Sequence, residues 1–170
     1  MHESSYKYMQ TFLSDYLRSG HKVLDVGSRR VLGHKTYREI ATALSGVEYT
    51  GLDIVSGINV DIVVEPYSWD ILPDNNFDIV ISGQAFEHIE FPWLTMEEIA
   101  RVIKTNGVIC IITPACDYKY HPYPIDTFRY MKDGYTALCK WVNMRCVKQL
   151  EIIDANNKTE DSVAIIRVGG

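Results

Sequence analysis

The sequence lacks the patterns that mark several classes of protein. Its four cysteines form no CxxC pair and have no histidine at ligand spacing, so they predict neither a zinc site nor a disulfide framework. No segment gathers five or more lysines and arginines, and the net charge is −5. A footprint for a phosphate backbone is missing, so we expect no nucleic-acid partner. No apolar run approaches the roughly 20 residues that cross a bilayer, so we expect no membrane partner either.

The composition is that of an ordinary globular protein. Of the 170 residues, 46% are hydrophobic and 23% are charged, which predicts one domain over residues 1–170. The first ten residues lack the basic patch and apolar stretch of a signal peptide, and free thiols suit a reducing compartment. We therefore expect a cytoplasmic protein.

Apolar spacing and stop signals divide the chain into alternating strands and helices. The predicted helices cover residues 5–18, 37–44, 94–103 and 132–141. The predicted strands cover residues 21–26, 47–52, 60–64, 77–82, 108–113, 145–153 and 162–168, the last two joined as a hairpin by a turn at 154–157. This alternation predicts an α/β protein whose parallel sheet is covered on both faces. Ligands of such sheets bind beyond the carboxyl ends of the strands.

The loops at those strand ends carry a glycine and two acids at informative positions. Asp25 and Gly27 end the first strand, and Asp53 ends the second. A glycine there lets the backbone pass close to a ligand, and an acid on the neighbouring strand can accept both hydroxyl hydrogens of a ribose. The pattern favours a nucleoside cofactor, although a plain turn and a helix cap remain the alternative for each residue alone.

A dinucleotide site would require G-x-G-x-x-G, whereas this loop reads Gly27-Ser28-Arg29-Arg30-Val31-Leu32-Gly33. The missing second and third glycines disfavour a nicotinamide-dependent oxidoreductase.

Four segments resemble the class I S-adenosylmethionine-dependent methyltransferases: VLDVGS at 23–28, GLDI at 51–54, PDNNFDIVISGQAFEHI at 73–89, and the run 96–114. The resemblance implies a Rossmann-like three-layer sandwich with a mostly parallel seven-stranded sheet of order 3-2-1-4-5-7-6 and a terminal antiparallel hairpin. Arg29 and Val31 stand where the family has further glycines. In this respect the chain resembles a subgroup encoded with surface-glycan enzymes.

The resemblance also implies the parts of a site for S-adenosylmethionine. Asp25 and Gly27 would flank its methionine part, and Asp53 would bind its ribose. Adenine would lie between Ile54 and the loop after the third strand. The predicted cofactor residues are Asp25, Gly27, Ser28, Asp53, Ile54, Pro66, Tyr67, Ser82 and Gly83. For Tyr67, ordinary packing is the alternative.

The segment HPYPIDTFRY at 121–130 gathers polar and aromatic side chains after the fifth strand. His121 could take a proton from a hydroxyl or amine while Asp126 orients its ring. The alternative is a structural loop, in which Asp126 and Arg129 form a salt bridge, favoured by their three-residue spacing, and His121 only satisfies backbone groups. His88 is a second catalytic candidate, unless Glu87 and His88 only cap their loop.

Two sequence patterns that are absent from these loops narrow the class of methyl acceptor. No Asn/Asp-Pro-Pro-Tyr motif follows the fourth strand, and no carboxylate group suggests a magnesium site, so no metal is expected. A small molecule or glycan remains, methylated on a hydroxyl or small amine, with a sugar hydroxyl preferred. The rival hypothesis is a non-catalytic protein that uses this fold to bind a nucleotide or a partner. A homodimer is possible, and the sequence leaves it open.

Overall fold

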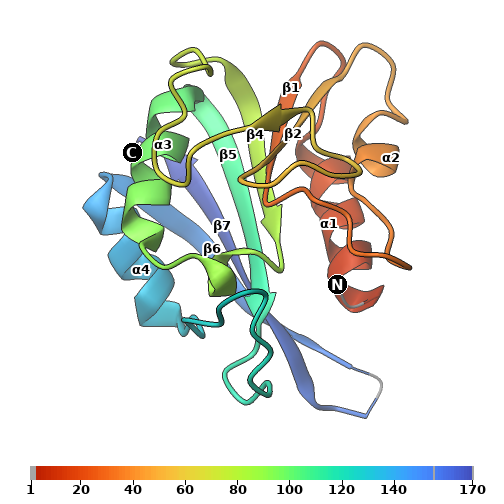
Figure 1. Cartoon of the computed structure of the whole chain (residues 1–170), viewed down its shortest axis with the longest axis vertical. Coiled ribbons are helices and arrows are strands. Elements are labelled where there is room, and N and C mark those ends of the chain that lie inside the picture. The colour runs from red at the N-terminus through yellow and green to blue at the C-terminus, as the bar shows by residue number, and fades with distance from the viewer. Residues whose placement is uncertain (1–2, 155, 170) are drawn as a thin grey trace.

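The short apolar runs of the sequence form one sheet in the computed structural model, which describes residues 3–154 and 156–169 (Figure 1). Its strands pair in the order β3-β2-β1-β4-β5-β7-β6, which confirms the predicted order. Their bounds are β1 Lys22–Val26, β2 Glu48–Asp53, β3 Ile62–Val63, β4 Phe77–Gly83, β5 Ile103–Pro114, β6 Met144–Ile153 and β7 Thr159–Val168. The first five strands are parallel, and β7 runs antiparallel to β5 and β6. The terminal hairpin is thus confirmed, although residue 155 of its predicted turn lies outside the described residues.

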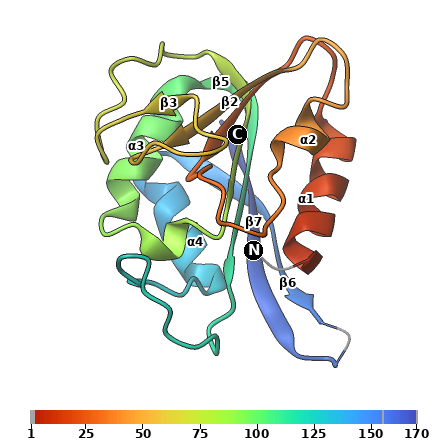
Figure 2. The same ribbon diagram turned by 45° about the vertical axis from the view of Figure 1, so that its right-hand side comes forward.

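Helices cover both faces of the sheet, as Figures 1 and 2 show. Helices α1 (Glu3–Tyr16) and α2 (Arg38–Ala41) lie on one face, and α3 (Pro92–Val102) and α4 (Lys132–Trp141) lie on the other. Ile79 and Ile81 of β4 pack in the same apolar cluster as Phe12 of α1, whereas Val80 packs with Met96 of α3. Because successive side chains of a strand point to opposite faces, one strand contributes to both cores. The predicted three-layer architecture is confirmed.

Two predicted elements are shorter than the sequence pattern indicated. The helix expected over residues 37–44 is limited to α2, a single turn. The backbone N–H and the hydroxyl of Thr42 both donate to the Arg38 carbonyl oxygen, each at 2.8 Å, so Thr42 makes the last bonds of this single turn. The strand expected over residues 60–64 is reduced to the two residues of β3.

The connection between α3 and β5 also differs from the expectation. The helix expected over residues 94–103 begins at Pro92, where a missing N–H costs no helical bond, and ends at Val102. The chain then enters β5 at once, because Ile103 pairs with Phe77 of β4. The register shifts before Val108 pairs with Ile79, so residues 104–107 form an irregular part of the strand rather than a separate turn.

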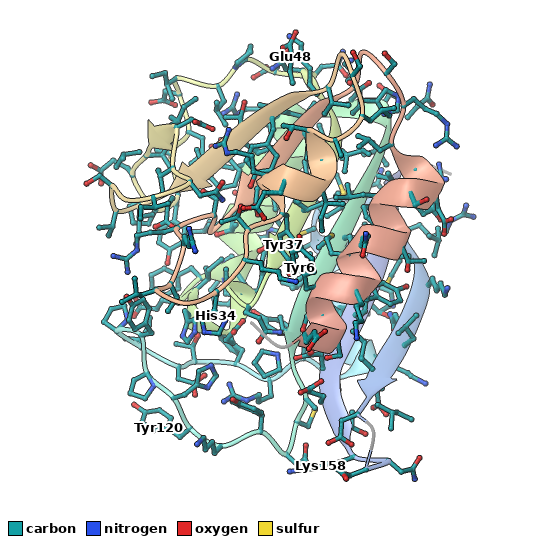
Figure 3. The ribbon with its side chains drawn as sticks, turned by 90° about the vertical axis from the view of Figure 1, so that its right-hand side faces the viewer. Tyr6, His34, Tyr37, Glu48, Tyr120 and Lys158 are labelled. Atoms are coloured by element: carbon teal, nitrogen blue, oxygen red, sulfur yellow. The ribbon has the colours of Figure 1, made fainter. Side chains whose placement is uncertain are left out.

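The two ends of the sheet have different surroundings. Glu48, at the start of β2, lies at one end of the molecule in Figure 3, and Tyr120 and Lys158 lie at the opposite end. The carboxyl ends of the parallel strands, the loop 115–131 and the β6–β7 turn share that second end (Figure 1). Among the described residues, no helix has the length and apolar character that membrane crossing requires.

Candidate active site

A small cavity marks the place where the connections of the sheet diverge. From β1 the chain continues toward β2 on one side, whereas β4 continues to β5 on the other, so their boundary is the switch point where α/β folds bind ligands. The cavity has a volume of about 90 Å³, and Asp25, Gly27, Ser28 and Gly83 are among its lining residues. A larger cavity of about 540 Å³ at the opposite end of the sheet contains none of the predicted site residues.

Gly27 has a backbone that only glycine adopts without strain. Its φ is +76°, and a Cβ built there would lie 2.3 Å from the Cβ of Ala85. The amide groups of Gly27 and Ser28 both donate to the Leu52 carbonyl oxygen, at 2.9 and 3.0 Å. The loop after β1 is therefore fixed between the end of β2 and the segment that follows β4.

Asp25 is buried beneath this loop in a polar network. It accepts a hydrogen bond from the Tyr49 hydroxyl, and burial raises its pKa to about 7 against the opposing effects of Tyr49 and Arg38. Asn59 Nδ2 donates to the Tyr49 hydroxyl at 3.1 Å and to the Ser28 carbonyl oxygen at 2.8 Å. Asp25 thus supports the loop from below as well as lining the cavity.

Arg38 completes that network from α2. Its Nε donates to Asn59 Oδ1 at 2.9 Å, its Nη2 pairs with Asp61 Oδ2 at 2.6 Å, and its guanidinium lies 4.3 Å from the centroid of the Tyr49 ring. Sequence reasoning missed Arg38, Tyr49 and Asn59. Asn59 has a φ of +75°, a conformation that asparagine tolerates better than most residues. An asparagine in a predicted turn was therefore the only sequence signal for this position.

Asp53 is placed as the sequence predicted, at the exposed end of β2. Its Oδ2 accepts from the Arg29 amide at 3.0 Å and its Oδ1 from the Val55 amide at 3.1 Å. A carboxylate has about four lone-pair positions, so each oxygen keeps one for a ligand. Ile54 beside it is 53% exposed.

The other predicted cofactor residues lie apart from the cavity. Tyr67 accepts from the Phe91 amide at 3.2 Å and packs on the Phe91 ring, with centroids 5.5 Å apart. Pro66 is exposed in the same loop after β3. Ser82 is fully buried and donates to the Val26 carbonyl oxygen at 2.8 Å, a contact that joins β4 to β1.

The loop 115–131 is attached to the short helix η1 (Phe86–His88), which follows β4 shortly after the cavity residues Gly83 and Gln84. The Thr127 amide and hydroxyl both donate to the Glu87 carbonyl oxygen, at 2.7 and 2.8 Å, and the Tyr130 hydroxyl donates to the Phe86 carbonyl oxygen at 3.1 Å. Arg29 Nη2, in the loop after β1, donates to the Tyr123 hydroxyl at 3.0 Å. The predicted acceptor loop therefore adjoins both η1 and the loop after β1.

Glu87 and the two candidate histidines meet at this junction, and we call them the Glu87–His88–His121 cluster. Glu87 Oε1 lies 3.6 Å from Nε2 of His88 and 3.8 Å from Nε2 of His121. The two imidazole rings are edge to face, with centroids 5.0 Å apart. Burial raises the pKa of Glu87 to about 8 and lowers that of His88. The sequence predicted both histidines as catalytic candidates, but it did not predict that both would lie beside the Glu87 carboxylate.

Asp126 and Arg129 form the predicted ion pair. Arg129 Nη2 donates to Asp126 Oδ2 at 2.8 Å, and this bond holds the pKa of Asp126 well below its usual range. Asp126 Oδ2 also accepts from the His121 amide at 2.7 Å and lies 3.2 Å from His121 Nδ1. The Asp126 carboxylate thus both pairs with Arg129 and contacts the His121 ring, so the two alternatives predicted for it are compatible.

Comparison with known proteins identifies the family. The model of a methyltransferase domain matches residues 24–111, which include the last three residues of β1, all of β2 and β4, the Glu87–His88 pair and most of β5. The chain belongs to this family. The methyltransferase uses S-adenosylmethionine as its cofactor, and the rival hypothesis of a non-catalytic protein is discarded. No curated protein matches the sequence.

Solved methyltransferase structures share the fold at low sequence identity. A methyltransferase from Aquifex aeolicus superposes with a TM-score of 0.70 at 19% identity, covering 92% of this chain and 87% of that one. The 1,6-didemethyltoxoflavin-N1-methyltransferase of Burkholderia thailandensis, solved with S-adenosylhomocysteine, gives 0.78 at 12% identity, with 98% and 79% covered. A methyltransferase from Archaeoglobus fulgidus gives 0.72 at 16% identity, with 94% and 93% covered.

Tyr37 is among the residues that line the cavity of the methyltransferase without having been predicted. Tyr37 is 2% exposed, and its hydroxyl has no hydrogen-bond partner in the described part of the chain. It lines the cavity beside Gly83, where an added Cβ would lie 2.2 Å from that hydroxyl, and its ring stacks on Tyr6 (Figure 3). An unsatisfied buried hydroxyl at a cavity wall is suited to a polar atom of a ligand.

Proposed function

We propose that this methyltransferase transfers the methyl group of S-adenosylmethionine to a hydroxyl group of a small molecule, a sugar in particular. The observation that carries the proposal is the Glu87–His88–His121 cluster. Its loop 115–131 is linked to the cavity by Arg29, a lining residue whose Nη2 donates to the Tyr123 hydroxyl at 3.0 Å. A hydroxyl is a poor nucleophile until its proton is removed, and imidazole and carboxylate groups are the usual acceptors of that proton.

In this proposal the cofactor spans the cavity and the exposed strand ends. A cavity of about 90 Å³ is smaller than the ~300–1,000 Å³ typical of ligand sites, so it receives only the methionine part, beside Gly27, Ser28 and Gly83. The ribose then lies outside on the free lone pairs of Asp53. Adenine lies over Ile54, with Pro66 and Tyr67 on its other side.

The chemistry requires proximity first and proton removal second. The acceptor oxygen forms a bond to the methyl carbon as the carbon–sulfur bond breaks, and sulfur leaves with the electron pair as a neutral thioether. Holding the two reactants in line accounts for much of the acceleration. The cluster receives the hydroxyl proton, with His121 as the proton acceptor because it is the more exposed of the two histidines, at 31% against 17% of the side chain.

Two sequence features support a hydroxyl over an amide or aromatic amine. Ser82-Gly83-Gln84-Ala85 stands where enzymes that grip such planar groups carry Asn/Asp-Pro-Pro-Tyr. The loop beginning at Gly27 is similar to a subgroup found with surface-glycan enzymes, which supports a sugar.

A labelling experiment tests the proposal. Purified protein and methyl-labelled S-adenosylmethionine are incubated with a panel of free and nucleotide-linked sugars and with a matched panel of amines, and products are identified by mass spectrometry. We expect label on a sugar oxygen. His121→Ala should lower kcat by roughly 10² to 10⁴ with little change in cofactor affinity. His21 lies at the other end of the sheet, so His21→Ala is the control and should leave kcat unchanged. Label on amines alone would refute the hydroxyl assignment.

A further inference from the structure

The Glu87–His88–His121 cluster has the composition and spacing of a metal site. Among the described residues, it is a group of carboxylate and imidazole side chains whose candidate ligand atoms all lie within 4.8 Å of one another. Its carboxylate–imidazole distances of 3.6 and 3.8 Å are too long for hydrogen bonds. Two ligands at ~2.0–2.1 Å from a tetrahedral Zn²⁺ are about 3.3–3.4 Å apart. The two distances from Glu87 to the histidines need to shorten by only about 0.2–0.5 Å to match this, and no pair in the cluster exceeds that spacing by more than about 1.5 Å.

The Glu87 carboxylate lacks the partners that a buried acid requires. The side chain is 0% exposed, and neither Oε1 nor Oε2 has a hydrogen-bond partner in the described residues. Its backbone carbonyl is satisfied by Thr127, so the deficit belongs to the carboxylate alone. The Arg129 guanidinium interacts with Glu87 electrostatically but does not hydrogen-bond to its carboxylate. An ionised carboxylate buried without donors is strongly disfavoured, and a directly bound cation removes that penalty.

Both imidazoles present an unprotonated nitrogen to Glu87. Nδ1 of His88 lies 2.6 Å from the Ile125 carbonyl oxygen, which only accepts, so Nδ1 carries the hydrogen and Nε2 the lone pair. Nδ1 of His121 lies 3.2 Å from both the Lys119 carbonyl oxygen and Asp126 Oδ2, which assigns the same tautomer. Histidines that bind metals donate their second ring N–H to such carbonyls and carboxylates.

Arg129 does not change this assignment of the His121 ring. Its Nη2 lies 3.3 Å from His121 Nδ1, but it donates to Asp126 Oδ2 at 2.8 Å and to the Lys119 carbonyl oxygen at 3.1 Å. Those two shorter bonds use both hydrogens of that nitrogen.

We propose that Glu87, His88 and His121 bind a divalent transition-metal ion, with Zn²⁺ as the representative, and that the ion holds the hydroxyl oxygen of the acceptor. The second part rests on the proposed function. Imidazole nitrogens favour Zn²⁺ and its neighbours over Mg²⁺, and three protein ligands leave one tetrahedral position open for a substrate oxygen. The metal replaces His121 as the group that activates the acceptor.

The reaction then balances without a further reagent. A metal-bound hydroxyl loses its proton near neutral pH, and the proton passes to water at the exposed side of the cluster. The metal-bound oxygen forms the new bond to the methyl carbon, the carbon–sulfur bond breaks, and S-adenosylhomocysteine leaves as the thioether. The methyl ether then dissociates from the ion.

Metal binding is tested on tag-free full-length protein that has been stripped with a chelator. Zn²⁺ is titrated in competition with a chromophoric chelator, and Co²⁺ is added separately to record its visible spectrum. We expect one ion per chain and the intense absorption of four-coordinate Co²⁺. His88→Ala and His121→Ala should each weaken Zn²⁺ binding by more than the 10- to 100-fold or so that loss of an outer-shell partner costs, and His21→Ala should not.

Equal Zn²⁺ affinity in wild type, His88→Ala and His121→Ala would overturn the proposal. Circular dichroism shows whether each variant is folded. If both histidine variants unfold, the wild-type Co²⁺ spectrum decides, because a weak spectrum like that of the hydrated ion overturns the site.

A second arm separates this inference from the proposed function. Sugar methylation is measured in stripped protein and after Zn²⁺ is restored, with S-adenosylhomocysteine binding followed by calorimetry as the control. A loss of at least tenfold that Zn²⁺ reverses, with unchanged cofactor binding, supports the metal. Equal methylation in stripped and restored protein refutes the metal's role while the proposed function stands. Tight Zn²⁺ binding at these residues without methylation of any hydroxyl supports the metal site and refutes the proposed function.

Discussion

Substitution of Gly27 tests how the loop after β1 is held. In Gly27→Ala, a side chain must occupy a backbone with φ of +76° and place its Cβ 2.3 Å from the Cβ of Ala85. Two carbons in contact lie about 3.5–4.0 Å apart, so one segment must move by more than 1 Å or so. Ala85 connects β4 to η1, and the displacement therefore affects the cavity lined by Gly27 and the Glu87–His88 pair together.

The expected loss of stability has two parts. The left-handed backbone costs about 1–2 kcal/mol for a residue with a Cβ. The overlap with Ala85 costs about 1–3 kcal/mol, as overpacking in a full core does. Gly27→Ala should therefore destabilise the protein by about 2–5 kcal/mol. Ala85→Gly removes the obstructing carbon, so the double variant should recover the overlap part and retain the backbone part.

Urea unfolding of wild type, both single variants and the double variant gives the coupling energy between the two positions. We expect about 1–3 kcal/mol in favour of the double variant, since contacting residues couple by such amounts. Calorimetry with S-adenosylhomocysteine should show at least tenfold weaker binding in Gly27→Ala and partial recovery in the double variant. Additive effects of the two substitutions, or unchanged cofactor affinity in a folded Gly27→Ala protein, would refute the reasoning.

Three other substitutions test single contacts. Asp53→Ala should weaken S-adenosylhomocysteine binding about tenfold or more, because hydrogen bonds to a charged acceptor contribute about 1.5–3 kcal/mol, and unchanged calorimetric affinity would disprove the ribose contact. The pKa of Asp25 is raised to about 7, so the stability it contributes is complete below its unfolded pKa and is lost as pH rises through 7. From pH 5 to pH 8, the free energy of unfolding measured in urea should therefore fall less in Asp25→Asn than in wild type, by on the order of 2 kcal/mol. Tyr37→Phe should stabilise the ligand-free protein by about 1 kcal/mol and weaken cofactor binding, whereas unchanged affinity would place the hydroxyl outside the ligand site.

Several features of the methyltransferase follow from local sequence. Continuous apolar runs form β1, β4 and β5 because each is buried on both faces, and this requirement is visible residue by residue. Gly27 was identifiable because only glycine combines a positive φ with so close a neighbour. Local pattern was less successful for α2, because the apolar spacing of residues 37–44 predicts a longer helix than the single turn Arg38–Ala41 that forms.

The sequence by itself determined the class of fold, the position of the glycine loop after β1 and the acid at the end of β2, because each depends on a short segment or on two adjacent strands. Only the tertiary structure decided which side chains meet. Glu87 and His121 are distant in the chain, and they come together because the loop 115–131 folds back onto η1 through the bonds of Thr127. Arg38 and Asn59 meet in the same way, across the end of β2. Such pairs depend on where loops close in space, and hydrophobic periodicity contains no information about that.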